Sequence, residues 1–385
     1  MDIYIMEKAY KEYTRWCRQR LPEDLAAELC AIRGDENEIY NRFCKDISFG
    51  TSGLRAKMGA GSNRINSVTL RKASIGISRY LNEKGTKPEL VIGFDTRNNS
   101  KEYAEIVAHE FADNGVDVYL FGEPTPVPVV SFAVRAMGVS GGIMITASHN
   151  TREYNGYKVY GADGAQMSPE DTAVVVGYIE EETDYFAPYR KMGITAGDIR
   201  GADGKEFENV TVIGKSVDAV YFNTIEKLML SPDAVKTSRD KMKVIYTPIH
   251  GSGYMPVTTM LERMGIPVET VPEQIAPDPD FSTVRVPNPE EADALSLAVS
   301  LAEKENASVV IGTDPDCDRM GVAVRDDEGE FVLLNGNQTG VLLMDYILRR
   351  KKDEKTLPEN AAVVKTIVST RLADCVAKDF GVTVF

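Results

Sequence analysis

The chain has 385 residues, of which 43% are hydrophobic and 26% are charged, ordinary proportions for a globular protein of two or three domains. A net charge of −14 argues against the broad basic face that binds nucleic acid, but it allows a local basic pocket for a small anion. No apolar run is long enough to cross a bilayer, and the first residues lack the pattern of a signal peptide. Five scattered cysteines fit reduced thiols. We expect a cytoplasmic protein without a nucleic-acid or membrane partner.

Strands and helices alternate along the chain after a helical stretch of about 45 residues that is interrupted at Pro22. The pattern predicts strands at residues 90–94, 116–121, 143–145, 243–247, 308–312, 322–324 and 331–334. It predicts helices at residues 68–84, 100–114, 290–306 and 338–349, a helix that begins near Ser168, and strand, helix and strand over 361–385. The proline-rich segment 267–289 is expected to be irregular.

Repeated units of this kind predict an α/β fold of successive three-layer domains with mixed, mostly parallel sheets. A looser stretch at residues 193–204 suggests the first domain boundary. We expect domain one over residues 1–205, domain two over 206–336 and part of a third domain over 337–385.

Polar loops at the ends of the predicted strands are the candidate sites, because parallel sheets place their chemistry there. The strand at 143–145 runs into Thr146, Ala147, Ser148, His149 and Asn150, which leaves the Ser148 hydroxyl free to react. These residue types are also common in ordinary turns. His149 directly follows Ser148, and we expect this adjacency to give poor geometry for a Ser–His pair.

Residues 49–55 form a loop with two glycines that let backbone amides approach a ligand, and Arg55 follows them. A guanidinium in this position suits a phosphate, although a glycine turn beside a surface arginine is common. Lys158 is a second candidate cation, which could donate or accept a proton if burial lowers its pKa, or could be an ordinary strand lysine.

Three carboxylates at alternate positions, Asp314, Asp316 and Asp318, follow the strand at 308–312. Hard oxygen ligands on one loop predict a magnesium site, with a solvated acidic turn as the alternative. An EF-hand is excluded because Arg319 stands at its sixth position. If Ser148 meets these aspartates across a cleft, the chemistry is phosphoryl transfer through a phosphoserine, with Arg55, Lys158 and Arg319 around it.

Together these stretches resemble the α-D-phosphohexomutase family. The resemblance rests on FGTSGLR at 49–55, on TASHN and YNGYK within 146–158, and on GTDPDCDR at 312–319, in that order over most of the chain. The sequence of residues 49–66 looks most like that of the bacterial phosphoglucomutase branch, which also has phosphopentomutase-like members.

The resemblance implies a role for each matching residue. Ser148 would carry the phosphoryl group and join Asp314, Asp316 and Asp318 as magnesium ligands. Arg55, Lys158 and Arg319 would be catalytic basic residues, and Lys158 and Arg319 would take part in acid/base steps. Substrate binding would fall to Thr51, Ser52, His149 and Lys365.

The resemblance also implies interconversion of glucose 1-phosphate and glucose 6-phosphate, with Mg²⁺ as cofactor and glucose 1,6-bisphosphate as activator. Two departures stand against it. Thr151 replaces the usual proline after TASHN, and the GExS and RxSGT loops of the third and fourth domains are missing. We therefore expect a truncated form, in which the missing loops could abolish mutase turnover of the isolated chain. The alternatives are a phosphomannomutase or phosphopentomutase, a noncatalytic sugar-phosphate-binding fragment, and a phosphatase.

Overall fold

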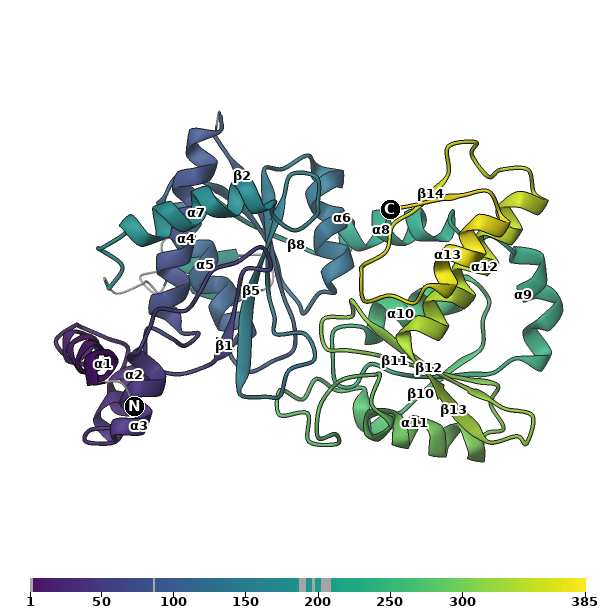
Figure 1. The fold of residues 1–385 in the computed structure, drawn as a ribbon, viewed down its shortest axis with the longest axis horizontal. Helices are drawn as coiled ribbons and strands as arrows, with labels where there is room; N and C mark the ends of the chain where they lie inside the picture. The colour runs from purple at the N-terminus through teal and green to yellow at the C-terminus, as the bar shows by residue number, and fades with distance from the viewer. Residues whose placement is uncertain (1–2, 86, 187–191, 196–197, 202–208) are drawn as a thin grey trace.

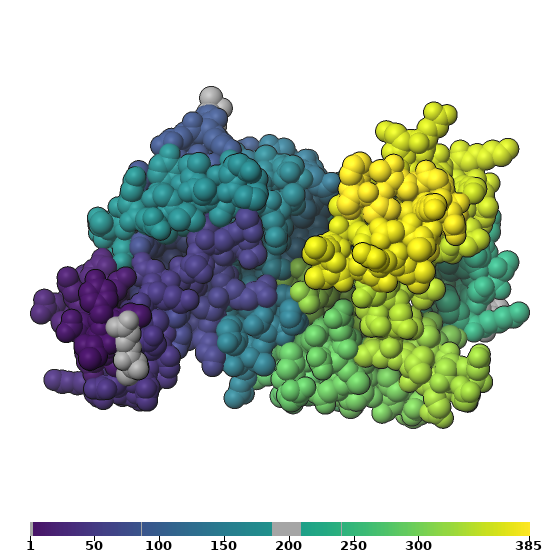
Figure 2. Space-filling model, viewed as in Figure 1, coloured from purple at the N-terminus to yellow at the C-terminus, as the bar shows by residue number. Residues whose placement is uncertain are grey.

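A computed structural model describes residues 3–85, 87–186, 192–195, 198–201 and 209–385. Figure 1 shows two α/β parts side by side, with the N-terminal helices at the far end of the first part and the C-terminal segment beside the second. In Figure 2 the two parts touch in the middle of the view and are separated by a notch above. The predicted α/β class is confirmed, since each part has a sheet covered by helices.

The predicted helical N-terminal stretch consists of α1 (Ile3–Cys17), α2 (Glu23–Ala31) and α3 (Glu36–Phe43). Pro22 directly precedes α2, and the Asp35 side chain accepts hydrogen bonds from the Asn37 and Glu38 amides at the start of α3. Trp16 and Phe43, both fully buried, form the centre of a small core between these helices. The apolar residues of these helices therefore serve packing.

The first sheet has six strands among the described residues, in the order β1-β5-β4-β2-β3-β8. Their bounds are β1 (Leu54–Lys57), β2 (Glu89–Phe94), β3 (Asp117–Phe121), β4 (Gly141–Ile145), β5 (Tyr154–Gly161) and β8 (Val210–Ile213). β4, β2, β3 and β8 are parallel, whereas β5 is antiparallel to both β4 and β1. The expected boundary near residue 205 stays a prediction, and β8 shows that this sheet takes its last strand from residues 210–213.

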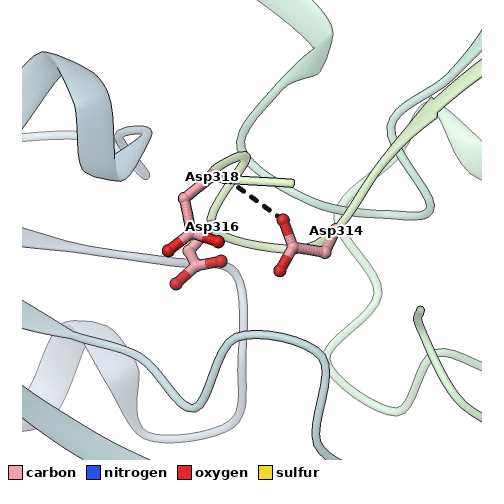
Figure 3. Close-up of side chains that lie close together, drawn as sticks. All are labelled: Asp314, Asp316 and Asp318. Carbon is pink, nitrogen blue, oxygen red and sulfur yellow. Dashed lines mark hydrogen bonds between the residues drawn. The ribbon is translucent and has the colours of Figure 1, made fainter. Parts of the chain in front are cut away.

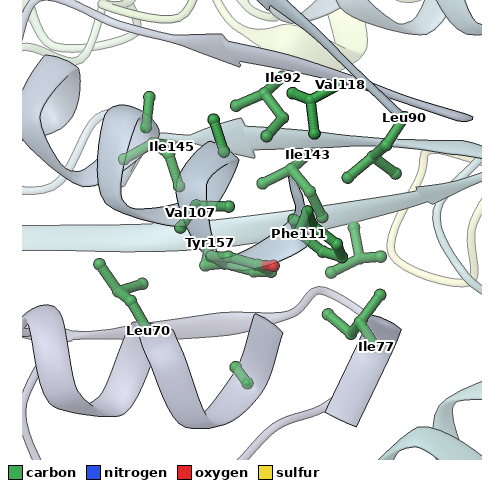
Figure 4. Packing of buried hydrophobic residues seen from close by; sticks show 14 of the residues in the cluster. Leu70, Ile77, Leu90, Ile92, Val107, Phe111, Val118, Ile143, Ile145 and Tyr157 are labelled. Atoms are coloured by element: carbon green, nitrogen blue, oxygen red, sulfur yellow. The ribbon is translucent and has the colours of Figure 1, made fainter. Parts of the chain in front are cut away.

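Helices cover both faces of this sheet, which gives the three layers that repeated βα units predict. The helices are α4 (Ser67–Glu83), α5 (Ser100–Asp113), α6 (Val127–Met137), α7 (Pro169–Glu181) and α8 (Lys215–Glu226). α4, α5 and α7 pack on one face and α6 and α8 on the other. Figure 4 shows Ile92 and Ile143 of the sheet facing Val107 and Phe111 of α5, with Leu70 of α4 nearby. Unbroken apolar strands fit this burial on both faces.

The second sheet has the order β10-β9-β11-β12-β13. Its strands are β9 (Val244–Thr247), β10 (Val268–Thr270), β11 (Val309–Thr313), β12 (Met320–Arg325) and β13 (Phe331–Leu334). α10 (Tyr254–Arg263) and α11 (Ala292–Lys304) lie on opposite sides of it, and α9 (Pro232–Ser238) lies farther out. The expectation that residues 267–289 are irregular is wrong for β10, a short edge strand that pairs with β9.

The remaining elements lie outside these two sheets. α12 (Gly336–Asp353), α13 (Leu372–Asp379), β14 (Ala362–Val363) and β15 (Thr383–Val384) form the C-terminal segment, and β6 (Met192–Thr195) and β7 (Asp198–Gly201) form a hairpin. Single turns of 3₁₀ helix occur at Arg239–Lys241 and Pro272–Gln274. No helix within the described ranges is both long and apolar enough to span a membrane.

The carboxyl ends of the parallel strands bring the polar loops together. β2 and β4 run side by side, so residues 95–97 and 146–150 lie at one edge of the first sheet. β9 and β11 likewise place residues 248–253 and 314–319 at one edge of the second sheet. The two edges meet where the Val127 amide at the start of α6 donates to the Asp316 carbonyl, 2.9 Å away.

The loop before β1 lies so close to β5 that one position requires glycine. Gly53 has φ +80°, and a Cβ there would lie 1.8 Å from the Tyr157 carbonyl oxygen and 3.1 Å from Lys158 Cα. Gly34 also has a positive φ, +87°, but has open space around it. The comparison separates backbone strain from collision.

Gly53→Ala is expected to lower the free energy of unfolding by about 3 kcal/mol or more, because strain and collision act together. Gly34→Ala, the matched control, is expected to cost about 1 kcal/mol from strain alone. Urea denaturation of both variants measures the difference, and equal losses would show that the loop can move away from β5.

Candidate active site

The three predicted carboxylates form a compact cluster on the loop after β11. One carboxylate oxygen from each of Asp314, Asp316 and Asp318 lies within 4.8 Å of the others. Figure 3 shows the three side chains converging on one space, with the Asp318 amide bonded to Asp314 Oδ1 at 3.2 Å. The Arg319 amide donates to the same oxygen at 3.0 Å. The loop thus folds around the side chain of its first aspartate.

Burial and neighbouring charges shift the pKa values of Asp314 and Asp316 in opposite directions. Asp314 and Asp316 are fully buried. Burial, followed by the charges of Asp316 and Asp318, raises the pKa of Asp314 to about 8. Burial alone would raise the pKa of Asp316 as well, but the Lys158 charge and hydrogen bond outweigh it and hold the pKa below its usual range. Burial and the neighbouring negative charges therefore favour the protonated form of Asp314, whereas Lys158 favours the ionised form of Asp316.

Ser148 lies directly against this cluster, although 166 residues separate it from Asp314. Its Oγ donates to Asp314 Oδ2 at 2.7 Å, and the side chain is buried, with the residue 2% exposed. Its backbone has φ +53°, an uncommon conformation for a residue with a side chain. The Thr146 hydroxyl accepts the Ser148 amide at 2.8 Å and also lies 3.1 Å from Asp316 Oδ2.

His149 departs from our expectation of poor geometry. Its Nδ1 lies 3.2 Å from Ser148 Oγ, because the left-handed turn at Ser148 brings the two side chains together. Burial, then the charges of Arg319 and Arg55, lowers the pKa of His149, which favours a neutral ring. The shorter hydrogen bond of Ser148 is nevertheless the one to Asp314.

Lys158 on β5 reaches across to two of the carboxylates. Its Nζ donates to Asp316 Oδ2 at 2.8 Å and to Asp318 Oδ2 at 2.7 Å, and its side chain is only 7% exposed. Burial by itself lowers the pKa of Lys158, but the two carboxylate charges outweigh it and raise the pKa. The hypothesis that burial lowers this pKa is wrong for this geometry, and Lys158 holds its proton firmly.

The remaining candidates surround this centre at the surface. Arg55 Nη1 donates to Asn150 Oδ1 at 3.2 Å, and Arg319 Nε lies 4.0 Å from Asp318 Oδ1. Thr51 and Ser52 are exposed at the tip of a turn that two backbone hydrogen bonds between Gly50 and Gly53 close. This turn lies beside Lys158, as the close approach of Gly53 requires.

Lys365 is the candidate that the structure does not bring to the cluster. Its Nζ lies 3.2 Å from Asp374 Oδ2 of α13, within the C-terminal segment. Its role in substrate binding stays a prediction.

Two buried residues of the site were missed in the sequence analysis, Asp95 and Arg97. Arg97 donates to the carbonyl oxygens of Ser148, Asn150 and Thr151, and its Nε lies 3.3 Å from Asp95 Oδ2. Asp95 Oδ2 in turn accepts from the Thr146 hydroxyl at 2.6 Å. An Asp-x-Arg directly after a buried apolar strand was the available signal, since charged residues in such a place need partners.

The donor set fits a magnesium ion. Three carboxylates on one loop are hard oxygen ligands, and Asp316 Oδ1 is buried without a hydrogen-bond partner. An unpartnered carboxylate oxygen at the centre of such a cluster is what a cation ligand requires. Ser148 Oγ, in contact with Asp314, could complete the set.

Comparison with known proteins agrees with this geometry. The family profile for phosphoglucomutase/phosphomannomutase matches residues 46–186 as its α/β/α domain I and residues 219–329 as its α/β/α domain II. Together the two ranges make up more than half of the chain. A phosphoglucomutase of Staphylococcus aureus is 36% identical over 346 residues, 89% of this chain and 59% of that protein. The chain thus spans less than two thirds of the length of this relative.

Solved structures give the same result. A putative phosphomannomutase from Thermus thermophilus has a TM-score of 0.70 at 26% identity, over 88% of this chain and 68% of that one. A phosphoglucomutase/phosphomannomutase family protein from Burkholderia thailandensis has a TM-score of 0.66 at 18% identity, over 88% and 66% of the two chains, and supports the fold alone.

Asp316→Asn is expected to weaken Mg²⁺ binding by roughly tenfold or more, because it removes one ligand charge from the cluster. Asp327→Asn, in the turn between β12 and β13, serves as the matched control and should leave the dissociation constant unchanged. Isothermal titration with MgCl₂ measures both. Equal affinity in the two variants would place the cation elsewhere.

Proposed function

Because the chain belongs to the phosphoglucomutase/phosphomannomutase family, we propose that it carries out the phosphoryl-transfer chemistry of a phosphoglucomutase. In this reaction a phosphoserine at Ser148 exchanges its phosphoryl group with a glucose monophosphate. The products are glucose 6-phosphate from glucose 1-phosphate and the reverse. This proposal makes the chain an intramolecular phosphotransferase.

The observation that carries the proposal is the 2.7 Å hydrogen bond between Ser148 Oγ and Asp314 Oδ2. It joins the serine loop of one sheet to the carboxylate loop of the other. A serine held among buried carboxylates has no evident role in a plain turn, but a serine that carries a phosphoryl group next to a cation does.

The residues divide the work as follows. In the priming step, and again when a turnover ends, Ser148 Oγ forms a bond to one phosphorus of glucose 1,6-bisphosphate while the ester bond from that phosphorus to the sugar oxygen breaks. The serine proton leaves, the sugar oxygen gains one, and a glucose monophosphate is released. Asp314, Asp316 and Asp318 would hold Mg²⁺, which, when bound, stabilises negative charge on the transferring group. We propose Lys158 and Arg319 as the partners in the acid/base steps; because the two carboxylates raise the pKa of Lys158, it stays protonated until it acts.

Substrate contacts follow from position. The exposed Thr51 and Ser52 lie on the turn beside Lys158, and Arg55 follows on β1, so all three can bind a phosphate. His149 is half-buried next to Ser148 and can contact the sugar. We propose sugar phosphates as the ligands, glucose 1,6-bisphosphate as the priming phosphoryl donor, and the cytoplasm as the location, since the five cysteines are free thiols.

Mannose phosphate is the second candidate substrate. The Thermus thermophilus neighbour is described as a putative phosphomannomutase, and its TM-score of 0.70 extends over most of this chain. Pentose phosphate is the third. The kcat/KM values for glucose, mannose and pentose 1-phosphates, measured with this chain and with the complete gene product, rank the three substrates.

Incubation with Mg²⁺ and glucose 1,6-bisphosphate is expected to add one phosphate to the chain, because Ser148 is the attacking group. Intact mass measures the addition, and peptide mapping should locate it on Ser148. Ser148→Ala should stay unmodified.

The other hypotheses give different results in the same experiment. A noncatalytic binding fragment would take up no phosphate while still binding Mg²⁺. A phosphatase would release inorganic phosphate from the sugar, and release that persists in Ser148→Ala would refute the phosphoserine mechanism.

A further inference from the structure

Ser148 is held in an unfavourable backbone conformation, and its own side chain does not explain how. A residue with a side chain at φ +53° is in a strained conformation, so surrounding contacts must fix it. The Thr146 hydroxyl bonds the Ser148 amide, but it leaves the carbonyl side of the loop free. The support for that side comes from Arg97.

Arg97 is a buried cation whose side chain is 0% exposed. Its guanidinium gathers the carbonyl oxygens of Ser148 and Asn150 through Nη2, and that of Thr151 through Nη1 at 3.1 Å. Carbonyls of successive residues normally point in different directions, and one planar cation that binds three of them fixes the loop. The bonds go to backbone atoms, so they define the path of the loop.

Asp95 fixes the other end of this arrangement. It lies 3.3 Å from Arg97 Nε, accepts the Arg97 amide at 3.0 Å, and accepts from Ser100 Oγ and Thr146 Oγ1 at 2.6 Å each. A buried ion pair is stable only when its remaining hydrogen bonds are made, as they are for Asp95. Asp95 thus ties Arg97 to the strand end from which the serine loop starts.

The second part of the molecule covers Arg97. The ring of Phe281 lies 4.9 Å from the guanidinium carbon, and Phe281 is 2% exposed. Next to it, Asn98 Nδ2 donates to Asp280 Oδ1 at 3.2 Å, and Arg152 Nη1 lies 3.7 Å from the same oxygen. The serine loop is therefore fixed against both parts of the molecule.

We propose that Arg97, held by Asp95 and covered by Phe281, is a positioning residue that keeps Ser148 in its left-handed conformation with Oγ directed at Asp314. Since its side chain is inaccessible, Arg97 does not touch the sugar phosphate and acts only through Ser148. The inference rests on the proposed function for its kinetic consequence, but not for its structural one.

The test is the rate at which glucose 1,6-bisphosphate phosphorylates Ser148, followed by intact mass over a range of bisphosphate concentrations. In Arg97→Lys the maximal rate should fall about 100-fold, because lysine keeps the charge but cannot bind three carbonyls in a plane. The half-saturating concentration should stay the same, since no substrate contact is lost. A raised half-saturating concentration with an unchanged maximal rate would overturn the proposal and make Arg97 a binding residue.

Arg42→Lys is the matched control. Arg42, on α3, is also ion-paired and largely buried. It forms hydrogen bonds to Glu28 and Glu38 of the N-terminal helices and to the Ala60 carbonyl. Its maximal rate should remain within about threefold of the unaltered chain. An equal loss in both variants would mean that general destabilisation, and not positioning, slows the reaction.

Hydrogen exchange separates failure of this inference from failure of the proposed function. If the unaltered chain takes up no phosphate, the proposed function fails, and the exchange of amides 146–152 decides the inference. Faster exchange there in Arg97→Lys, but not in Arg42→Lys, supports it, and unchanged exchange overturns it. Should Arg97→Lys not fold, Phe281→Leu replaces it, with the same pattern expected at a smaller amplitude.

Discussion

The attraction between one buried lysine and two carboxylates holds this site together. Asp314 and Asp316, on the loop after β11, are buried away from water. Carboxylate charges whose oxygens lie within 4.8 Å of one another repel strongly. Lys158 supplies compensating charge from the other sheet to Asp316 and to the more exposed Asp318, so this charge balance exists only when the two parts of the molecule meet. Breaking such a buried pair typically costs about 3–5 kcal/mol, against about 0–1 kcal/mol for a pair at the surface.

The same meeting point explains how two distant segments form one centre. Parallel strands put their loops at one edge of each sheet, and the two edges face one another. The first sheet contributes Ser148 and Lys158, and the second contributes the three aspartates that we propose as cation ligands. Backbone hydrogen bonds, such as the one from the Val127 amide to the Asp316 carbonyl, fix the distance between the two edges.

Local patterns in the sequence were sufficient to predict the α/β class, most strands, the serine loop and the aspartate loop. Each depends on a short stretch, an apolar strand followed by residues of particular chemistry. Strands β1, β8 and β10 and helices α8, α9 and α10 were missed, because weak or short patterns compete with prolines and glycines nearby. The bonds of Lys158 to Asp316 and of Arg97 to the serine loop join residues remote in sequence, so no local pattern reveals them.

The loops that start at Thr146 and Thr247 have the same backbone conformation but different side chains at the turn. In both, the threonine hydroxyl accepts the amide two residues later, and that residue has a positive φ, +53° at Ser148 and +46° at Ile249. The first loop places a hydroxyl at the turn and the second an isoleucine. The backbone conformation is thus shared, and at the turn position the first loop has a hydroxyl that can attack phosphorus, whereas the second has an apolar side chain.

The central claim is that Ser148 and the three aspartates form one phosphoryl-transfer centre around a divalent cation. Electron spin-echo spectroscopy of the Ser148-phosphorylated chain with Mn²⁺ in place of Mg²⁺ tests it most directly, because coupling to ³¹P requires the phosphate to lie next to the metal. The account predicts a resolved ³¹P coupling that disappears in Asp316→Asn. Tightly bound Mn²⁺ without any ³¹P coupling would contradict it.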